Sequence, residues 1–189
     1  MRRQDVADAG TVSNGKERGP RKSGIHREPP SFHEISSMPQ ITYTRAALVA
    51  EVRQWLATPY RHQASVKGVG ADCLGLVRGV WRAFYGTEPA RLPAYTPDWA
   101  EAGGAEQLAE AGRAHLVAVD PADALPGDVL LFRFAANAPA KHAGILSAGT
   151  AHAGLFIHAY ELSAVTETRL APWWRRRLAF VFRFPDVSE

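Results

Sequence analysis

A single cysteine, Cys73, stands where a helix is expected to begin. Asp72 is a favourable N-cap residue, Gly86 supplies a C-terminal stop, and apolar residues recur between them at helical spacing. At the start of a helix, backbone N–H groups and the helix dipole favour the thiolate, which is the form of cysteine that attacks carbonyl carbon. We therefore expect Cys73 to be a nucleophile held as a thiolate, and not a small buried hydrophobe.

Two downstream histidines supply the base that such a nucleophile needs. His142 and His158 lie on consecutive predicted strands, separated by a turn around Gly149-Thr150-Ala151. If that turn is central, the histidines lie opposite or diagonal to each other, and direct cross-strand neighbours have Cβ atoms roughly 5 Å apart. One imidazole can then orient the other. A register slip of one residue would put them on opposite faces, so the prediction depends on the turn.

Zinc binding is the competing chemistry for these side chains. Cys73, His142 and His158 are ligand types that zinc accepts. We rank zinc below nucleophilic catalysis because no carboxylate or second thiol completes the set, and we expect neither a metal nor a cofactor. Among the other histidines, His62 is interpreted as a surface-loop residue and His152 as an exposed turn residue.

Composition limits the classes of protein to which the chain can belong. Its 189 residues, 46% of them hydrophobic, suit one domain with an appendage. No apolar run approaches the roughly 18 residues of a membrane span. One cysteine excludes an internal disulfide. The formal charge is +3, and much of the basic excess lies at the two ends of the chain, which is weak evidence for nucleic-acid binding. We therefore expect no nucleic-acid partner and, because no apolar run is long enough, no membrane span.

The N-terminal 40 residues differ in composition from the rest. Residues 1–40 are rich in Gly, Pro, Ser and charge, lack periodicity, and are predicted to be disordered. No apolar h-region follows Met1-Arg2-Arg3, so no secretory signal is expected there. Met38 precedes the first periodic segment, and we interpret the residues before it as a mis-assigned extension. Residues 41–189 are then the folded domain.

The elements that must position the candidate residues follow from periodicity and from helix and strand breakers. Helices come first and strands follow, an order that indicates an α+β fold with an antiparallel sheet. Gly75 and Gly79 share a face of the cysteine helix, where another backbone can approach closely. The predicted helices cover Arg45–Ala57, capped by Thr42 or Thr44, then Cys73–Tyr85 and Asp98–Ala111, with a short turn at Pro172–Arg176. The predicted strands cover Leu116–Val119, Asp128–Phe134, His142–Ala148, Leu155–Glu161, Ala164–Arg169 and Leu178–Phe184.

Four motifs follow one another along the chain, and Thr58-Pro59-Tyr60 precedes them: Asp72-Cys73-Leu74-Gly75-Leu76-Val77, Leu125-Pro126-Gly127-Asp128-Val129-Leu130-Leu131-Phe132, His142-Ala143-Gly144-Ile145 and Ile157-His158-Ala159. In this order they resemble the NlpC family of papain-like cysteine peptidases, in which the segment before the cysteine matches as well. The resemblance covers roughly residues 45–184 and implies a papain-like fold, with N-terminal helices packed on a central antiparallel sheet of about five to six strands.

The resemblance implies a role for each matching residue. Cys73 resembles the nucleophile, and His142 the general base that later protonates the leaving amine. His158 resembles the third, polar member that fixes the tautomer of the base. Tyr60 resembles the tyrosine whose hydroxyl helps to bind the oxyanion, with the Cys73 N–H as its partner donor. The family cleaves amide bonds in peptidoglycan stem peptides, typically next to D-glutamate and diaminopimelate.

One departure from the family pattern suggests a subgroup. Many members have serine where this chain has Leu74, and a bulky residue there is similar to the versions in phage tails and gene transfer agents. That likeness implies phage-like tail or baseplate proteins as partners, synthesis in the cytoplasm, and delivery in a particle to the periplasmic cell wall. Two alternatives stay open, namely a catalytically silent plug of a tail tip and an acyl or amide transferase on the same fold.

Three further positions have more than one interpretation. Asp128 is interpreted as a residue that closes the turn after Gly127, although it could also support the site. Trp173 and Trp174, followed by three arginines, are either a pair that packs on the sheet or a patch for the cell wall or a partner.

Overall fold

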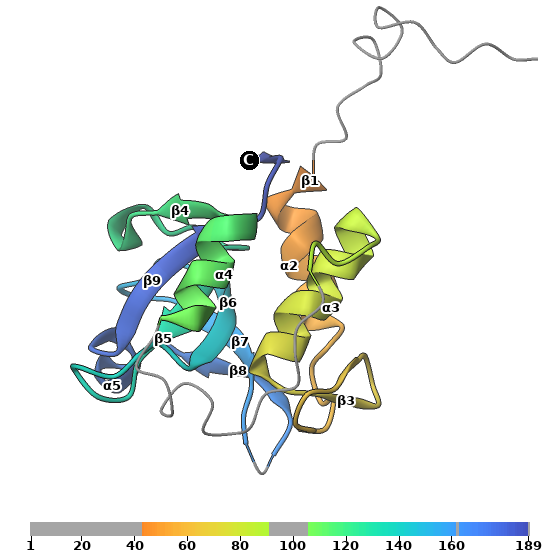
Figure 1. Ribbon diagram of the computed structural model, residues 1–189, viewed down its shortest axis with the longest axis horizontal. Helices are drawn as coiled ribbons and strands as arrows, with labels where there is room; N and C mark the ends of the chain where they lie inside the picture. Colours follow the sequence, from red (N-terminus) through yellow and green to blue (C-terminus); the bar gives the residue numbers. More distant parts are fainter. Residues whose placement is uncertain (1–42, 91–105, 162, 189) are drawn as a thin grey trace, which may run out of the picture. The chain divides into compact units, whose positions relative to one another are not determined.

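The computed structural model of the chain describes residues 43–90, 106–161 and 163–188 (Figure 1). The expectations for residues 1–40, for Met38 and for a helix start at Asp98 lie outside these residues. None of the helices in the described ranges is both long enough and apolar enough to cross a membrane.

A six-stranded sheet forms the centre of the described domain, and all of its pairings are antiparallel. Its strand order is β4-β9-β5-β6-β7-β8. The predicted α+β class and the predicted sheet are confirmed, with strand ends displaced from the predicted ones by two residues at most. The strands are β4 (Val117–Val119), β5 (Val129–Phe132), β6 (His142–Ala148), β7 (Leu155–Ala159), β8 (Val165–Arg169) and β9 (Leu178–Arg183).

Three of the described helices precede this sheet in the chain, and a fourth, α5, lies between its strands β8 and β9. The cysteine helix and the short turn lie where they were predicted, whereas two helix ends were wrong by four residues. The first helix, α2, stops at Arg53, and the third, α4, extends to His115. They are α2 (Arg45–Arg53), α3 (Cys73–Tyr85), α4 (Gln107–His115) and α5 (Pro172–Arg175), with a 3-10 turn η1 (Pro121–Asp123).

The early end of α2 has a local cause. Gln54 and Trp55 bond to carbonyls three residues back, which tightens the chain, and Ala57 has a positive φ of 64°. The N–H of Ala57 donates to the carbonyl of Val165 at the edge of the sheet, at 2.9 Å. The helix therefore ends several residues ahead of Pro59, because the chain turns to form this bond with β8.

Two short strand pairs were not predicted. β1 (Tyr43–Thr44) pairs with β10 (Val187–Ser188) in parallel, so the two ends of the described domain lie side by side. β2 (Ser65–Val66) pairs with β3 (Gly70–Ala71) in front of the cysteine helix. Strands of two residues carry too little periodicity to be recognised in sequence.

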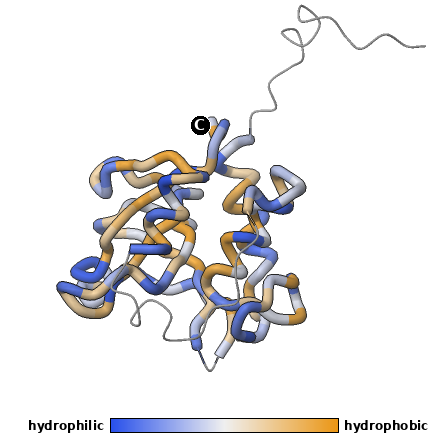
Figure 2. Tube along the Cα trace, in the orientation of Figure 1, coloured by the Kyte–Doolittle hydropathy of each residue, from blue (hydrophilic) through white to orange (hydrophobic). Residues whose placement is uncertain are grey.

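Each face of the sheet has its own hydrophobic core. Residues of α2, α3 and α4 pack against one face, together with Ala143 and Ile145 of β6. On the other face, Leu146 of β6 packs with Phe156 and with Trp174 of α5. Figure 2 shows hydrophobic stretches running through the strands and the helix segments that face them.

Asp128 belongs to a buried ion cluster and not to the histidine pair. Its carboxylate is fully buried and accepts from Arg45 at 3.0 Å and from Arg183 at 3.0 and 2.9 Å. It lies just before β5, whereas Phe132 at the other end of β5 pairs with His142. The alternative in which Asp128 supports the site is therefore wrong, because about 13 Å of strand separates them.

Candidate active site

The N-terminus of α3 is held in place by its capping residue. Asp72 is the N-cap, and its Oδ1 accepts the N–H of Gly75 at 2.7 Å while its Oδ2 accepts the N–H of Gln63 at 2.7 Å. A Cβ at Gly75 would lie 1.9 Å from the carbonyl oxygen of Ala64. Only glycine therefore allows the preceding loop to pack against the first turn, which is the close backbone approach predicted for this position.

Cys73 is the first residue of α3 and is half-buried. The backbone N–H groups of Ala143, Leu74 and Cys73 itself donate toward its sulfur and lower the pKa of the thiol. Burial and, secondarily, the charge of Asp72 outweigh them and raise the pKa of the thiol to about 12. The expectation of a thiolate in the free protein is therefore wrong, because desolvation exceeds the effect of the helix terminus. The bond from Ala143 places the sulfur beside the start of β6.

His142 and His158 form the predicted pair. His142 Nε2 and His158 Nδ1 are 2.8 Å apart, with the two rings nearly perpendicular at 89°. The register pairs Ile145 with Ile157 and Leu146 with Phe156, so the histidines are diagonal neighbours on the same face. Of the two arrangements predicted from the sequence, opposite or diagonal, the structure shows the diagonal one.

Aromatic packing keeps both imidazoles neutral. The ring of His158 stacks on Phe156 at 4.5 Å, and Trp174 contacts His142 and His158 at 5.5 and 5.1 Å between centroids. Burial lowers the pKa of His142 to about 3, with a further contribution from His158, and lowers the pKa of His158 to about 4. At neutral pH the site thus holds a thiol and two uncharged imidazoles.

Thr168 is a further member that the sequence analysis missed. Its Oγ1 lies 3.0 Å from His158 Nε2. If the hydroxyl accepts from His158 Nε2–H, His158 Nδ1 accepts from His142 Nε2–H, and His142 Nδ1 remains unprotonated as a base. The register of β7 with β8, which places Thr168 opposite Phe156, is the signal that could have found it.

Tyr60 lies beside the cysteine because its loop is tied to two neighbouring segments. Its N–H donates to the carbonyl of Ser163 at 3.0 Å, and it forms an isolated bridge with Ala71. Burial first, then the charges of Cys73, Asp72 and Glu161, raise the pKa of Tyr60 to about 12. The hydroxyl therefore stays protonated and able to donate.

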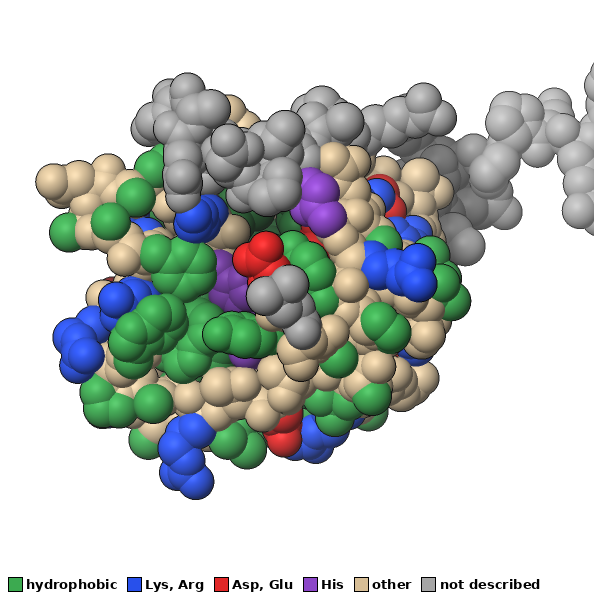
Figure 3. Space-filling model, turned by 90° about the horizontal axis from the view of Figure 1, so that it is seen from below, with side chains coloured by type: hydrophobic (Ala, Val, Ile, Leu, Met, Phe, Trp, Pro, Cys, Tyr) green, Lys and Arg blue, Asp and Glu red, His purple; other side chains and the backbone are tan. Residues whose placement is uncertain are grey.

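The two tryptophans have different environments. Trp174 is buried in the core of the sheet face that carries the histidines, whereas Trp173 is 44% exposed. Figure 3 shows hydrophobic side chains gathered around a hollow in which a histidine is visible. The interpretation as a residue that packs on the sheet is therefore confirmed for Trp174, whereas the patch for the cell wall or a partner stays a prediction for Trp173.

His62 and His152 do not belong to the pair formed by His142 and His158. His62 Nδ1 is 3.7 Å from Asp72 Oδ2, and His152 is exposed in the β6–β7 loop. Among residues 43–90, 106–161 and 163–188, no three His, Cys, Asp or Glu side chains are grouped to hold a metal ion.

Comparison with known proteins gives the fold. No protein-family model matches the sequence, and no curated protein matches it. A solved NlpC/P60 family protein from Bacillus cereus is 19% identical, with 76% of this chain and 41% of that chain covered and a TM-score of 0.55. This chain has the NlpC/P60 fold. Two Trichomonas vaginalis structures, NlpC2 and NlpC1, give TM-scores of 0.51 and 0.50 at 20% and 19% identity, over 74% of this chain and 46% and 43% of theirs.

The papain-like architecture implied by the sequence motifs is thereby confirmed at the level of the fold. The chain spans less than half the length of the three NlpC/P60 proteins named. Within this fold, the cysteine stands at a helix N-terminus and the histidines on adjacent strands.

Proposed function

We propose that the chain is a cysteine peptidase that hydrolyses amide bonds in peptidoglycan stem peptides. The observation that carries the proposal is the 2.8 Å hydrogen bond between His142 Nε2 and His158 Nδ1. His142 lies on β6, and the N–H of the next residue on that strand, Ala143, donates to the sulfur of Cys73. A thiol, an imidazole and an orienting polar group in this order form a nucleophile–base–orienter set. The sequence motifs supply the substrate class.

The neutral resting state determines how the reaction starts. Cys73 attacks the scissile carbonyl carbon while His142 takes the thiol proton, so charge develops only when a substrate excludes water from the site. The Tyr60 hydroxyl and the Cys73 N–H donate to the oxyanion. His142 then gives its proton to the leaving amine, and water, activated by the same imidazole, hydrolyses the thioester.

The proposal extends to a phage-like tail or gene transfer agent particle as the carrier. Leu74, at the position that is similar to those versions, lines a cavity of about 160 Å³ between α3, α4 and the sheet, together with Val77 and Trp81. In this proposal the protein is made in the cytoplasm, binds tail or baseplate proteins and acts at the periplasmic cell wall. Mass spectrometry of purified particles from the native host tests it, and particles that lack the chain would contradict it.

The activity is tested with muropeptides under reducing conditions. Wild-type protein is expected to give two fragments whose summed mass exceeds that of the substrate by one water, and Cys73→Ala to give none. A fragment joined to an added amine would instead indicate the transferase alternative. Intact substrate with both proteins would contradict the peptidase and favour the structural plug, which also predicts normal particle assembly by Cys73→Ala.

A further inference from the structure

A second pocket lies where β6 ends and β7 begins, between the β6–β7 loop (residues 149–154) and the chain that links β8 to α5. We call it the β6–β7 loop pocket. Its volume is about 480 Å³, which is in the range of about 300–1,000 Å³ that is usual for small-molecule sites. His142 begins β6 and Ala148, which lines the pocket, ends it, so roughly 20 Å of strand lies between that wall of the pocket and His142.

Three basic residues from three different segments line the β6–β7 loop pocket. Arg169 ends β8, Arg175 ends α5, and His152 lies in the β6–β7 loop. Within the described parts of the chain, no Asp or Glu lines the pocket, and none forms an ion pair with Arg169 or Arg175. The pocket therefore presents positive charge that no described carboxylate compensates.

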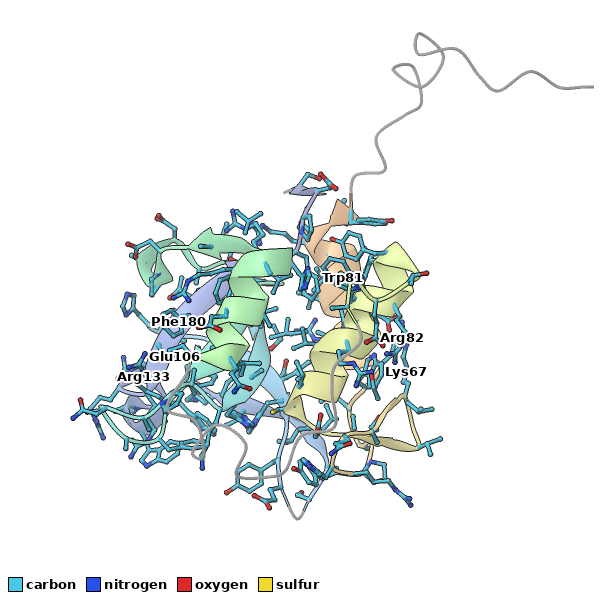
Figure 4. All side chains as sticks on the ribbon, in the orientation of Figure 1. Lys67, Trp81, Arg82, Glu106, Arg133 and Phe180 are labelled. Atoms are coloured by element: carbon cyan, nitrogen blue, oxygen red, sulfur yellow. The ribbon has the colours of Figure 1, made fainter. Side chains whose placement is uncertain are left out.

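Two other arginines of the domain show what this pocket lacks. Arg133 lies beside Glu106, with Nη2 3.0 Å from Oε1 (Figure 4), and Arg78 Nε donates to Glu88 at 2.7 Å. The charge of each of these guanidinium groups is compensated within the protein. Arg175 donates instead to a neutral acceptor, a backbone carbonyl, which leaves its charge available to an anionic ligand.

Hydrogen bonds between the two segments fix the walls of the pocket before any ligand arrives. Arg175 Nη1 donates to the carbonyl of His152 at 2.8 Å, and the N–H of Leu170 donates to the carbonyl of Gly154 at 2.9 Å. The first bond holds a guanidinium against the β6–β7 loop, and the second joins that loop to the chain that follows β8. A site whose groups are already in place loses less entropy when a ligand binds.

The arrangement of the basic residues favours phosphate over carboxylate. A guanidinium binds either anion through paired N–H donors. A carboxylate presents two oxygens in one plane, whereas a phosphate ester presents three oxygens in different directions, which suits donors that come from three segments. A phosphate group does not fill 480 Å³, and the pocket is also lined by Leu155, Ala171 and Pro172, against which an apolar group can pack.

We propose that the β6–β7 loop pocket binds a phosphate ester. Its phosphate is held by the two arginines and His152, and its organic group packs on the apolar part of the lining. Cys73 and the histidine pair take no part in this site, so the inference does not depend on the proposed peptidase function, and its tests use no cleavage assay.

Calorimetric titration of the full chain with phenyl phosphate tests the proposal, with benzoate and inorganic phosphate at equal ionic strength as comparison ligands. Phenyl phosphate is expected to bind saturably and about tenfold more tightly than benzoate, which carries the same ring on a planar anion. It is also expected to bind more tightly than inorganic phosphate, which lacks the ring. No saturable binding, or an affinity for either comparison ligand equal to that for phenyl phosphate, would overturn the proposal.

Two substitutions locate the site. Arg169→Gln and Arg175→Gln each remove one guanidinium and should weaken the binding of phenyl phosphate about tenfold. Arg176→Gln, which removes the same charge from an exposed residue outside the pocket, is the matched control and should leave the affinity unchanged. Equal weakening by all three folded variants, checked by thermal melting, would mean general charge attraction and would refute the pocket.

Backbone amide chemical shifts show directly where the ligand binds. Gly149 and Gly154 line the pocket, whereas Gly68 lies in the β2–β3 hairpin and serves as the reference. During titration of the wild-type protein with phenyl phosphate, the amide signals of Gly149 and Gly154 are expected to shift with one saturation curve, and that of Gly68 to stay in place. Shifts at Gly68 without shifts at Gly149 and Gly154 would contradict the proposal.

Discussion

The sulfur of Cys73 is subject to opposing influences, and their balance decides how the site works. Three N–H groups favour the thiolate, whereas burial and the carboxylate of Asp72 favour the thiol and prevail. An imidazole with its pKa lowered to about 3 does not remove that proton at rest. The thiol therefore loses its proton to His142 in the step that forms the bond to carbon.

Alkylation of Cys73 tests this balance. Because burial raises the pKa of the thiol to about 12, the thiolate fraction, and with it the rate of reaction with iodoacetamide, should rise about tenfold per pH unit from pH 7 to pH 10 without levelling off. The urea-unfolded chain is the control and should level off above about pH 8.5. A plateau below pH 8 in the folded protein would show an ionised cysteine.

Thr168 provides the second test at the residue scale. Its Oγ1 lies 3.0 Å from His158 Nε2, and when the hydroxyl accepts from that nitrogen, the bond between the two histidines leaves His142 Nδ1 unprotonated as the base. Thr168→Val, which keeps the shape but removes the hydroxyl, should lower kcat/KM about tenfold, whereas Thr168→Ser should restore most of it. Urea midpoints for both variants serve as the control. Full activity of the valine variant would show that the hydroxyl has no part in orienting the histidines.

Among the elements, those with a complete hydrophobic period were predictable. The cysteine helix, capped by Asp72 and closed by Gly86, and β6 have the predicted bounds. The end of the first helix was not predictable, because a bond from Ala57 to β8 decides it. In the candidate site, the contact between the two histidines could be predicted from residue types and spacing. The protonation state of Cys73 could not, because it depends on burial of the side chain, which no local sequence pattern reveals.

Gly144 of β6 is the position where element geometry affects the site most directly. A Cβ there would lie 2.6 Å from the ring of Phe156, 3.0 Å from the carbonyl oxygen of Ile157 and 3.1 Å from the Cβ of His158. Gly144→Ala should therefore cost about 1–3 kcal/mol of unfolding free energy and reduce activity by displacing the histidine pair. Both are measured by urea unfolding and peptide cleavage.

A double-mutant cycle distinguishes this clash from a general loss of strand stability. Combining Gly144→Ala with Phe156→Leu removes the ring that the new methyl group meets, so the two free-energy changes should be less than additive. Strict additivity would mean that the ring yields without cost and that glycine has another role there.

In the described domain as a whole, an ion cluster that stabilises the fold and the histidines of the proposed active site lie at opposite ends of β5. At one end of β5, the buried carboxylate of Asp128 holds α2 through Arg45 and β9 through Arg183. At the other end, Phe132 pairs with His142. Apolar side chains fill the length of β5 between them.

Asp128→Asn tests this separation. Removal of this fully buried charge takes away the carboxylate to which Arg45 and Arg183 both donate, so the free energy of unfolding should fall by about 3–5 kcal/mol in urea titrations. The kcat of the protein that remains folded should not change, because the cluster lies about 13 Å of strand away from His142. Glu167→Gln breaks the Arg53–Glu167 pair, which is 3.7 Å long and has side chains 50% and 29% exposed, and it should cost less than about 1 kcal/mol. Equal losses of stability in the two variants, or a kcat that falls in step with stability, would mean that the ion cluster is not an independent anchor of the fold.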